Sequence, residues 1–218
     1  MVKVKICGLT RSGDVEMVCE SGADMVGVIV NAKVPTPRNL DYRKARRVLE
    51  QVPSGVEKVA VGMPENLSEG LEIVNELDPD YLQLHSFPAL NEVEELREAT
   101  GIKLISAISI PREAMDSNAV VDCADRIADV SDYLLLDTER LARGRTGETH
   151  DWSISRRIRK SLDKPIFLAG GLNPSNVREA IKKVEPYGVD AASGVEAKPG
   201  VKDQEKVRAF VKASKMVK

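Results

Sequence analysis

Strand-like and helix-like segments alternate along the whole chain, and this alternation limits the possible folds more than any other feature. Between the strand-like runs, apolar residues recur at i, i+3 and i+4, most clearly over Asp41–Val52, Asn66–Leu77 and Pro88–Thr100. Eight β-then-α units in 218 residues are near the minimum for an α/β fold of the (β/α)8 barrel type. The eight strand-like runs are Val2–Cys7, Met25–Val30, Val56–Val61, Tyr81–Leu84, Lys103–Ile108, Tyr133–Leu136, Pro165–Ala169 and Val189–Ala192.

The competing architecture is an open, doubly wound sheet built from the same kinds of units. Such a sheet more often carries a Gly-x-Gly-x-x-Gly turn after its first strand, and the chain has none there. The chain also has no linker, no low-complexity tract and no block of like charge. We therefore predict a single-domain (β/α)8 TIM barrel over residues 1–218. The segment Asp116–Asp132 is the hardest to interpret, although Asp122–Asp129 has a helical pattern.

Charge and composition exclude several classes of protein. The 34 acidic and 32 basic residues nearly cancel and form no basic stripe, so we expect no nucleic-acid partner. No apolar run approaches the ~20 residues of a membrane helix, and Lys3 and Lys5 interrupt any signal peptide, so we expect no membrane partner. Three cysteines that lie far apart argue against a disulfide framework and indicate a cytoplasmic protein. With two histidines and no Cys-x-x-Cys pair, we expect no zinc site of the usual spacing.

The first strand-like run ends at Cys7, and Gly8 follows it. Its alternation of apolar and polar residues predicts a half-buried strand. In a (β/α)8 barrel the carboxyl ends of the strands meet on one face, where barrel enzymes carry out their chemistry. Arg38 lies in the loop after the second strand and belongs to the same face. The residues at the other strand ends that should converge with Cys7 are His85, Asp137, Gly170, Gly171, Ser193 and Gly194.

The glycines after the seventh and eighth strands indicate a phosphate site. Glycine lets a ligand approach the backbone, and the pair Asn173-Pro174 predicts a helix start whose N–H groups favour an anion. The loops after these two strands are where barrels commonly hold phosphate. The alternative is that the glycines only form tight turns. Two such loops at the two expected places favour phosphate.

Cys7 and Asp137 are the candidates for proton transfer. A thiol reaches the thiolate form near neutral pH if positive charge is close, although most cysteines are small buried apolar residues. A carboxylate that emerges from a buried strand meets a low dielectric, which suits a general acid. The alternative for Asp137 is a capping or ion-paired aspartate, and its position alone does not decide between the two roles.

Two further residues admit two interpretations each. His85 either lines the pocket or is a structural histidine. Arg38 either clamps a carboxylate or phosphate or is merely solvated. The loop 141–149 contains glycines and arginines and is predicted to be a flexible cover over the site.

Motifs in a fixed order along the chain resemble those of the phosphoribosylanthranilate isomerase family, a barrel family of tryptophan biosynthesis. Each motif is modestly specific, and together they span the chain. They are Lys5-Ile-Cys-Gly-Leu-Thr10, Leu82-Gln-Leu-His85, Leu135-Leu-Asp137, Thr146-Gly-Glu-Thr-His-Asp-Trp152, Leu168-Ala-Gly-Gly-Leu-Asn-Pro174, Gly188-Val-Asp-Ala-Ala-Ser-Gly-Val-Glu196 and Gly200-Val-Lys-Asp203.

The resemblance implies an Amadori rearrangement of an aminoaldose to an aminoketose, with Cys7 as general base and Asp137 as general acid. It implies no metal and no organic cofactor, because the amine of the substrate acts as the electron sink. The expected partner is a small phosphorylated ribosyl-anthranilate substrate, bound by a monomer or homodimer. The substrate-binding residues that the resemblance implies are Arg38, His85, Gly170, Gly171, Asp190, Ser193 and Gly194.

The chain departs from the family pattern in its loops. His150 stands where phenylalanine is common, Ser86 follows the motif histidine, and the segments 31–37 and 144–147 differ from the usual versions. One rival is the histidine-pathway isomerase of a larger aminoaldose, which resembles this fold but has an aspartate in place of Cys7 and two phosphate sites. The other is a non-catalytic barrel that binds a sugar phosphate.

Overall fold

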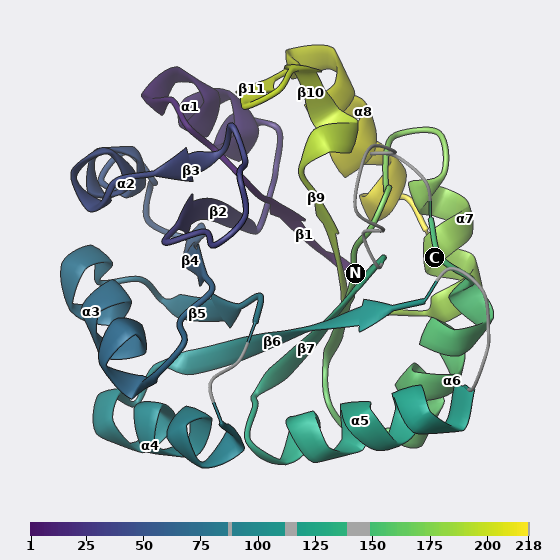
Figure 1. The fold of residues 1–218 in the computed structure, drawn as a ribbon. Coiled ribbons are helices and arrows are strands. Elements are labelled where there is room, and N and C mark those ends of the chain that lie inside the picture. The colour runs from purple at the N-terminus through teal and green to yellow at the C-terminus, as the bar shows by residue number, and fades with distance from the viewer. Residues whose placement is uncertain (87–88, 112–116, 139–148, 218) are drawn as a thin grey trace.

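The computed structural model describes residues 1–86, 89–111, 117–138 and 149–217. Over these ranges, strands form the interior of the molecule and helices form a ring around them (Figure 1). The predicted loop 141–149 lies outside the described residues except for Thr149. Among the described helices, none is both long enough and apolar enough to span a bilayer.

Eight parallel strands close into a barrel, as the alternation predicts. The sheet runs from β1 around to β2, and pairing of β1 with β2 closes it. The barrel strands are β1 (Lys3–Ile6), β2 (Met25–Val30), β4 (Glu57–Gly62), β5 (Tyr81–Leu84), β6 (Lys103–Ile110), β7 (Tyr133–Thr138), β8 (Ile166–Leu168) and β9 (Gly188–Ala191).

Helices follow the barrel strands and pack their apolar stripes on the outside of the sheet. The ambiguous segment Asp116–Asp132 contains a helix, in agreement with the pattern at Asp122–Asp129. The helices are α1 (Ser12–Glu20), α2 (Tyr42–Leu49), α3 (Leu67–Leu77), α4 (Leu90–Thr100), α5 (Ser117–Asp129), α6 (Trp152–Ser161), α7 (Val177–Val184) and α8 (Gln204–Lys215).

Three short strands lie outside the barrel and have no clear sequence pattern. Strand β3 (Asn39–Leu40) extends the sheet beside β2, and β10 (Glu196–Lys198) forms an antiparallel pair with β11 (Val201–Lys202). A 3-10 turn, η1 (Ser193–Val195), connects β9 to this pair. Segments of two or three residues are too short to show a periodicity, so the sequence does not reveal them.

Alternating residues of each strand point into the barrel or toward the helices. On β7, for example, Leu134 and Leu136 belong to the outer core beneath the helices, whereas Leu135 belongs to the barrel interior. The interior cluster consists of Cys7, Met25, Val59, Val61, Tyr81, Ile105, Ala107, Leu135, Phe167 and Ala169.

Three local predictions need correction. The first strand is not half-buried, because the side chain of Lys5 points into the barrel and has no exposed area. Strand β7 does not stop at Leu136, because Asp137 pairs with Ser109 of β6 and so lies inside the strand. Helix α7 does not begin at Asn173, whose side chain accepts a hydrogen bond from the backbone N–H of Ser175 at 2.9 Å and caps a turn instead.

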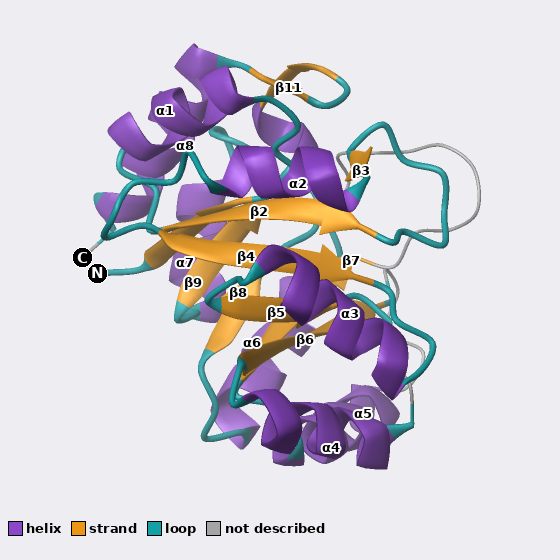
Figure 2. Ribbon diagram, turned by 90° about the vertical axis from the view of Figure 1, so that its left-hand side faces the viewer, coloured by secondary structure: helices purple, strands orange, loops and turns teal. Residues whose placement is uncertain are grey.

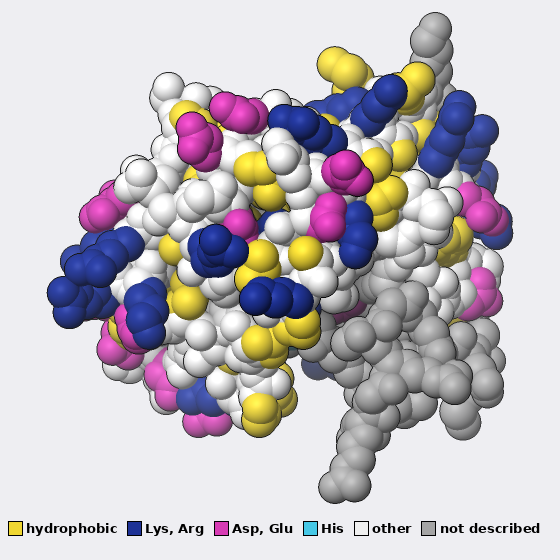
Figure 3. Space-filling model, turned by 90° about the horizontal axis from the view of Figure 1, so that it is seen from above, with side chains coloured by type: hydrophobic (Ala, Val, Ile, Leu, Met, Phe, Trp, Pro, Cys, Tyr) yellow, Lys and Arg dark blue, Asp and Glu magenta, His cyan; other side chains and the backbone are white. Residues whose placement is uncertain are grey.

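The strand arrowheads point away from the side of the molecule on which both termini lie (Figure 2). The face opposite the termini therefore carries the carboxyl ends of the barrel strands. On the surface shown in Figure 3, lysine and arginine side chains lie among aspartates and glutamates.

Candidate active site

A cavity at the carboxyl ends of the strands contains six of the residues singled out from the sequence. Cys7 follows β1, His85 follows β5, and Asp137 and Asp190 belong to β7 and β9. Arg38 comes from the segment before β3, and Ser193 begins η1. Residues up to 186 positions apart in the chain thus share one pocket, because closing the barrel brings all strand ends together. The full predicted set in this pocket is Cys7, Arg38, His85, Asp137, Asp190 and Ser193.

Cys7 lies one residue beyond β1, and its position is fixed by the backbone. Its N–H donates to the carbonyl of Ala191 at 2.9 Å, so the pairing of β1 with β9 continues through it. The side chain is only 5 % exposed. Burial raises the pKa of the Cys7 thiol above its ordinary value, and the charges of Lys5 and Lys202 only partly offset this effect. A catalytic thiolate at this position therefore requires nearby positive charge.

Asp137 faces His85 across the cavity. The Nε2 atom of His85 lies 3.7 Å from Oδ2 of Asp137, and the two side chains are 34 % and 17 % exposed. The other oxygen, Oδ1, accepts a hydrogen bond from the N–H of Thr138 at 2.8 Å. The N–H of Thr138 thus orients the carboxyl group of Asp137, which lines the cavity where a ligand could exchange a proton with it.

Arg38 is not a solvated loop residue. Its Nε atom donates to Oε1 of Glu196 at 2.8 Å, and Nη2 bonds the other carboxylate oxygen at 2.5 Å, which makes a bidentate pair. Its side chain also lies over Gly8, where a Cβ would meet the Cδ of Arg38 at 2.6 Å. Glu196 and the glycine together fix the arginine at the rim of the cavity.

Glu196 has a second basic partner, Lys202 of β11. The Lys202 ammonium donates to Oε1 of Glu196 and to the carbonyl of Ala192, both at 3.0 Å. Burial raises the pKa of Glu196, but Arg38 and Lys202 outweigh it, so that the pKa lies below its ordinary value. The carboxylate stays charged and orients Arg38 from the β10–β11 pair.

The two glycine loops lie against each other at the same end of the barrel. A Cβ on Gly194 would be 2.0 Å from the carbonyl oxygen of Leu172, so the η1 turn touches the loop after β8. Gly170 has a φ of +82°, and a Cβ there would be 2.4 Å from the backbone nitrogen of Thr138. Both glycines are required by close backbone approach, which is the property a phosphate-binding loop exploits. Of the two loops, Ser193 lines the cavity, and Gly170, Gly171 and Gly194 do not.

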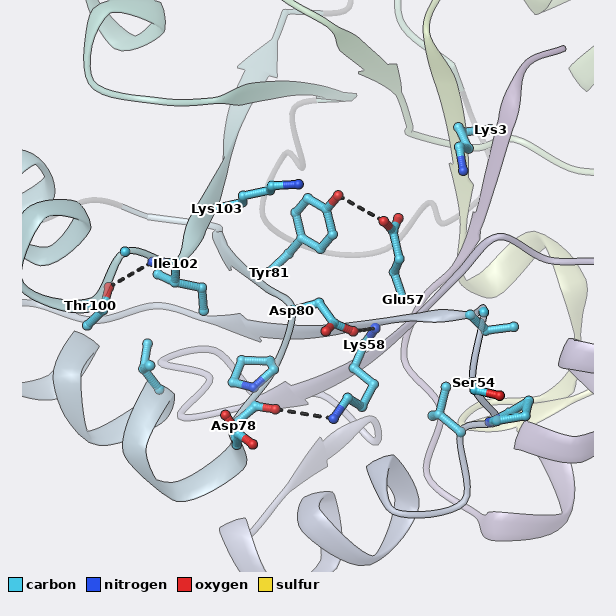
Figure 4. Close-up of a pocket in the computed structure, with 17 residues that line it drawn as sticks. Lys3, Ser54, Glu57, Lys58, Asp78, Asp80, Tyr81, Thr100, Ile102 and Lys103 are labelled. Atoms are coloured by element: carbon cyan, nitrogen blue, oxygen red, sulfur yellow. Dashed lines mark hydrogen bonds between the residues drawn. The ribbon is translucent and has the colours of Figure 1, made fainter.

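A second pocket, of about 820 Å³, lies at the other end of the barrel (Figure 4). Tyr81 donates its hydroxyl to Glu57 at 3.1 Å, and the ammonium of Lys103 lies 5.4 Å from the centre of the tyrosine ring. This pocket surrounds the amino-terminal ends of β4, β5 and β6. In barrel enzymes this end serves stability rather than catalysis, and none of the predicted site residues reaches it.

Comparison with known proteins identifies the family. The family model described as N-(5'phosphoribosyl)anthranilate (PRA) isomerase matches residues 4–213. The chain belongs to this family. Similar curated relatives include the N-(5'-phosphoribosyl)anthranilate isomerases of Haloferax volcanii, 42% identical over 99% of this chain and 94% of the relative, and of Methanocaldococcus jannaschii, 40% identical over 100% and 98%.

Solved structures of the isomerase family agree with the fold. The phosphoribosyl anthranilate isomerase of Thermotoga maritima superposes with a TM-score of 0.85 at 34% identity, over 99% of both chains. A complex of the enzyme with reduced 1-(o-carboxyphenylamino)-1-deoxyribulose 5-phosphate has a TM-score of 0.81 at 32% identity, again over 99% of both chains. The predicted family, barrel fold and isomerase activity in tryptophan biosynthesis are thereby confirmed.

Sequence reasoning missed four polar residues at the site. Glu196 and Lys202 occur in the motifs without a predicted role, and Lys5 is a polar position of a strand predicted to be half-buried, whereas its side chain has no exposed area. Gln83 lines the cavity with 2 % exposure, and its Oε1 accepts no hydrogen bond within the described part of the chain. Strand periodicity could have found Lys5 and Gln83, because each stands two positions before a predicted site residue and so faces the same side of its strand.

Proposed function

We propose that the chain converts N-(5-phosphoribosyl)anthranilate into 1-(2-carboxyphenylamino)-1-deoxyribulose 5-phosphate, with Cys7 as general base and Asp137 as general acid. The observation that carries the proposal is that both side chains enter one cavity from different barrel strands. An acid and a base in separate places can address two atoms of one sugar. Family membership supplies the reaction, and the geometry supports the assignment of roles.

The reaction begins with protonation of the furanose ring oxygen by Asp137. The bond from that oxygen to C1 breaks, and the anthranilate nitrogen forms an iminium with C1. The Cys7 thiolate then removes the proton on C2, and the electron pair forms a C1–C2 double bond that neutralises the iminium. The enolamine gains a proton at C1 and loses the hydroxyl proton at C2, which gives the ketone. The product is an isomer of the substrate, so that protons are moved and none is gained or lost.

The remaining predicted residues hold the substrate. The loops with Gly170 and Gly171, and with Ser193 and Gly194, bind the phosphate through backbone N–H groups. Arg38, oriented by its carboxylate partner, binds an anionic group of the substrate. His85 and Asp190 complete the pocket around the ribosyl carbons.

The test is a turnover assay with the purified chain. Consumption of phosphoribosylanthranilate, followed as loss of its anthranilate-type fluorescence, should proceed in the presence of a chelator. The histidine-pathway aminoaldose serves as the parallel substrate and should turn over far more slowly. Binding without turnover would instead support a sugar-phosphate-binding barrel, and dependence on added metal would contradict the proposed chemistry.

The protein works on its small-molecule substrate in the cytoplasm as a monomer or a homodimer. One similar solved structure is described as mutually generated monomers of the dimeric enzyme of Thermotoga maritima. Light scattering on the eluting peak of a size-exclusion column distinguishes the two states of this chain by mass.

A further inference from the structure

Lys5 is an unusual residue for the interior of a barrel. Its side chain has no exposed area, and it lies on β1 two positions before Cys7, on the same face of the strand. A buried ammonium needs a compensating negative charge. The Lys5 ammonium meets this need at Oδ1 of Asp190, 3.1 Å away, and the side chain of Asp190 is only 9 % exposed.

The same ammonium lies close to the thiol of Cys7. A Cβ built on Gly27 of β2 would lie 3.2 Å from Sγ of Cys7 and 3.3 Å from Nζ of Lys5, so that both atoms rest against one point of the neighbouring strand. Lys5 therefore lies between a carboxylate and a thiol, and both compete for its charge.

The electrostatics of the cluster follow from this arrangement. Burial lowers the pKa of Lys5, but Asp190 and Cys7 outweigh it and raise the pKa above its ordinary value, so the lysine stays cationic. Burial raises the pKa of Cys7, Lys5 and Lys202 lower it, and Asp190 raises it. Both lysines have a carboxylate partner, Asp190 for Lys5 and Glu196 for Lys202, and of the two Lys5 lowers the pKa of Cys7 more.

We propose that Lys5 is a positioning residue whose ammonium stabilises the Cys7 thiolate, and that Asp190 sets how much of this charge the thiolate receives. Asp190 accordingly acts on the base in addition to any contact with substrate. The catalytic meaning of this arrangement rests on the proposed function. The charge relation between Lys5 and Cys7 does not, because it is a property of the free protein.

If the Lys5–Asp190 ion pair only joined β1 to β9, the lysine would not need to lie beside Cys7. Lys5 and Asp190 are already register partners in the β1–β9 ladder, which backbone pairing holds together. Apolar pairs of similar volume are often as stabilising in such positions as buried ion pairs. The closeness of the Lys5 ammonium to Sγ of Cys7 is the feature that a structural pair does not explain.

The experiment titrates the thiolate directly by its absorbance near 240 nm, as the difference between each protein and the same protein with Cys7→Ser. In Lys5→Met the thiolate should be at least about tenfold less populated at a fixed pH than in the wild type. In Asp190→Asn the lysine charge is released to the thiol, so the titration should move to lower pH. Changes of opposite sign are not expected from general damage to the barrel.

The matched control is Lys164→Met, which removes a half-buried lysine whose ammonium bonds the carbonyl of Ser131 near the start of β8. It should leave the Cys7 titration unchanged. Circular dichroism checks that each variant is folded. If Lys5→Met does not fold, Asp190→Asn decides the question, because an unchanged or rising thiol pKa in that variant overturns the proposal.

The pH profile of kcat/KM links the titration to catalysis. Its thiolate-dependent limb should move to higher pH in Lys5→Met and to lower pH in Asp190→Asn, in step with the absorbance titration. A wild-type protein without isomerase activity but with the expected thiol shifts would remove the proposed function and leave the charge relation intact. If the enzyme is active but the Cys7 titration is the same in Lys5→Met, in Asp190→Asn and in the wild type, the inference is refuted and the proposed function stands.

Discussion

At the scale of single residues, the site is built from groups whose charge states depend on close partners. Cys7 is buried beside a lysine and an aspartate, and Asp137 is held at one oxygen by the N–H of Thr138. The sequence predicted the chemical types and their place at the strand ends. It could not predict their protonation, because that depends on neighbours that are remote in the chain.

We expect Cys7→Ala and Asp137→Asn each to lower kcat by at least ~10², because each removes one of the two proton-transfer groups. Steady-state kinetics in the fluorescence assay measures the effect. Cys123→Ala removes an exposed thiol and is the matched control, with an expected rate equal to the wild type. A wild-type rate in either site variant would show that its assigned role is wrong.

His150 makes a separate prediction about stability. Its ring is buried and bonds the hydroxyls of Thr138 at 2.9 Å and Ser155 at 2.6 Å. Burial lowers its pKa from 6.5 to about 4, although Asp151 acts in the opposite direction. In the unfolded chain this histidine binds a proton below about pH 6.5, whereas in the folded protein it does so only below about pH 4. The free energy of unfolding therefore falls as the pH is lowered from 6.5 to 4.

The expected loss from this one group is about 3 kcal/mol, measured by urea unfolding across the range. In His150→Gln the pH-dependent component should disappear, even if the variant is less stable at neutral pH. An equal slope of unfolding free energy against pH in wild type and variant would contradict the assignment. Because the ring bonds Thr138, the same contact steadies the residue next to Asp137.

At the scale of elements, the β10–β11 pair lies outside the barrel but holds residues of the site in place. It carries Glu196 and Lys202, and through Glu196 it orients Arg38 above the cavity. The sequence placed Arg38 near the site but gave no reason for the glutamate. Elements this short have no periodicity, so their function appears only in the contacts they make.

We expect Glu196→Gln to raise KM about tenfold, roughly 1.4 kcal/mol of binding, with a smaller change in kcat. The loss of the bidentate carboxylate frees Arg38 from its fixed orientation. Glu185→Gln is the control: it removes the exposed carboxylate that follows α7 and pairs with Arg156 of α6, and unchanged kinetics are expected. An unchanged KM in Glu196→Gln would show that Arg38 does not depend on this partner.

At the scale of the whole molecule, closure of the barrel brings the residues of the site together. Strand β1 pairs with both β2 and β9, so the first and last barrel strands share one ladder. The apolar interior combines side chains from strands around the barrel, from Met25 on β2 to Phe167 on β8, and so depends on the closed sheet. This dependence supports the prediction that residues 1–218 form one domain.

Thermal unfolding of the full chain should accordingly show one transition, with the calorimetric enthalpy equal to the van't Hoff enthalpy. A parallel measurement on the wild type by tyrosine absorbance follows the cluster of Tyr81, Tyr133 and Tyr187 at the amino-terminal end. Its midpoint should coincide with the loss of helical circular dichroism. Two resolved transitions would contradict a single cooperative domain.

The sequence by itself determined the barrel and the face on which the chemistry lies. Alternating segments and strand periodicity are local properties, and they fix which elements form and which residues, such as Cys7, end a strand. Only the tertiary structure decided the charge partners. Lys5 and Asp190 are 185 positions apart, and Arg38 and Glu196 are 158 apart. Closure of the sheet brings each pair together, and burial in a low dielectric then makes their charges govern the site.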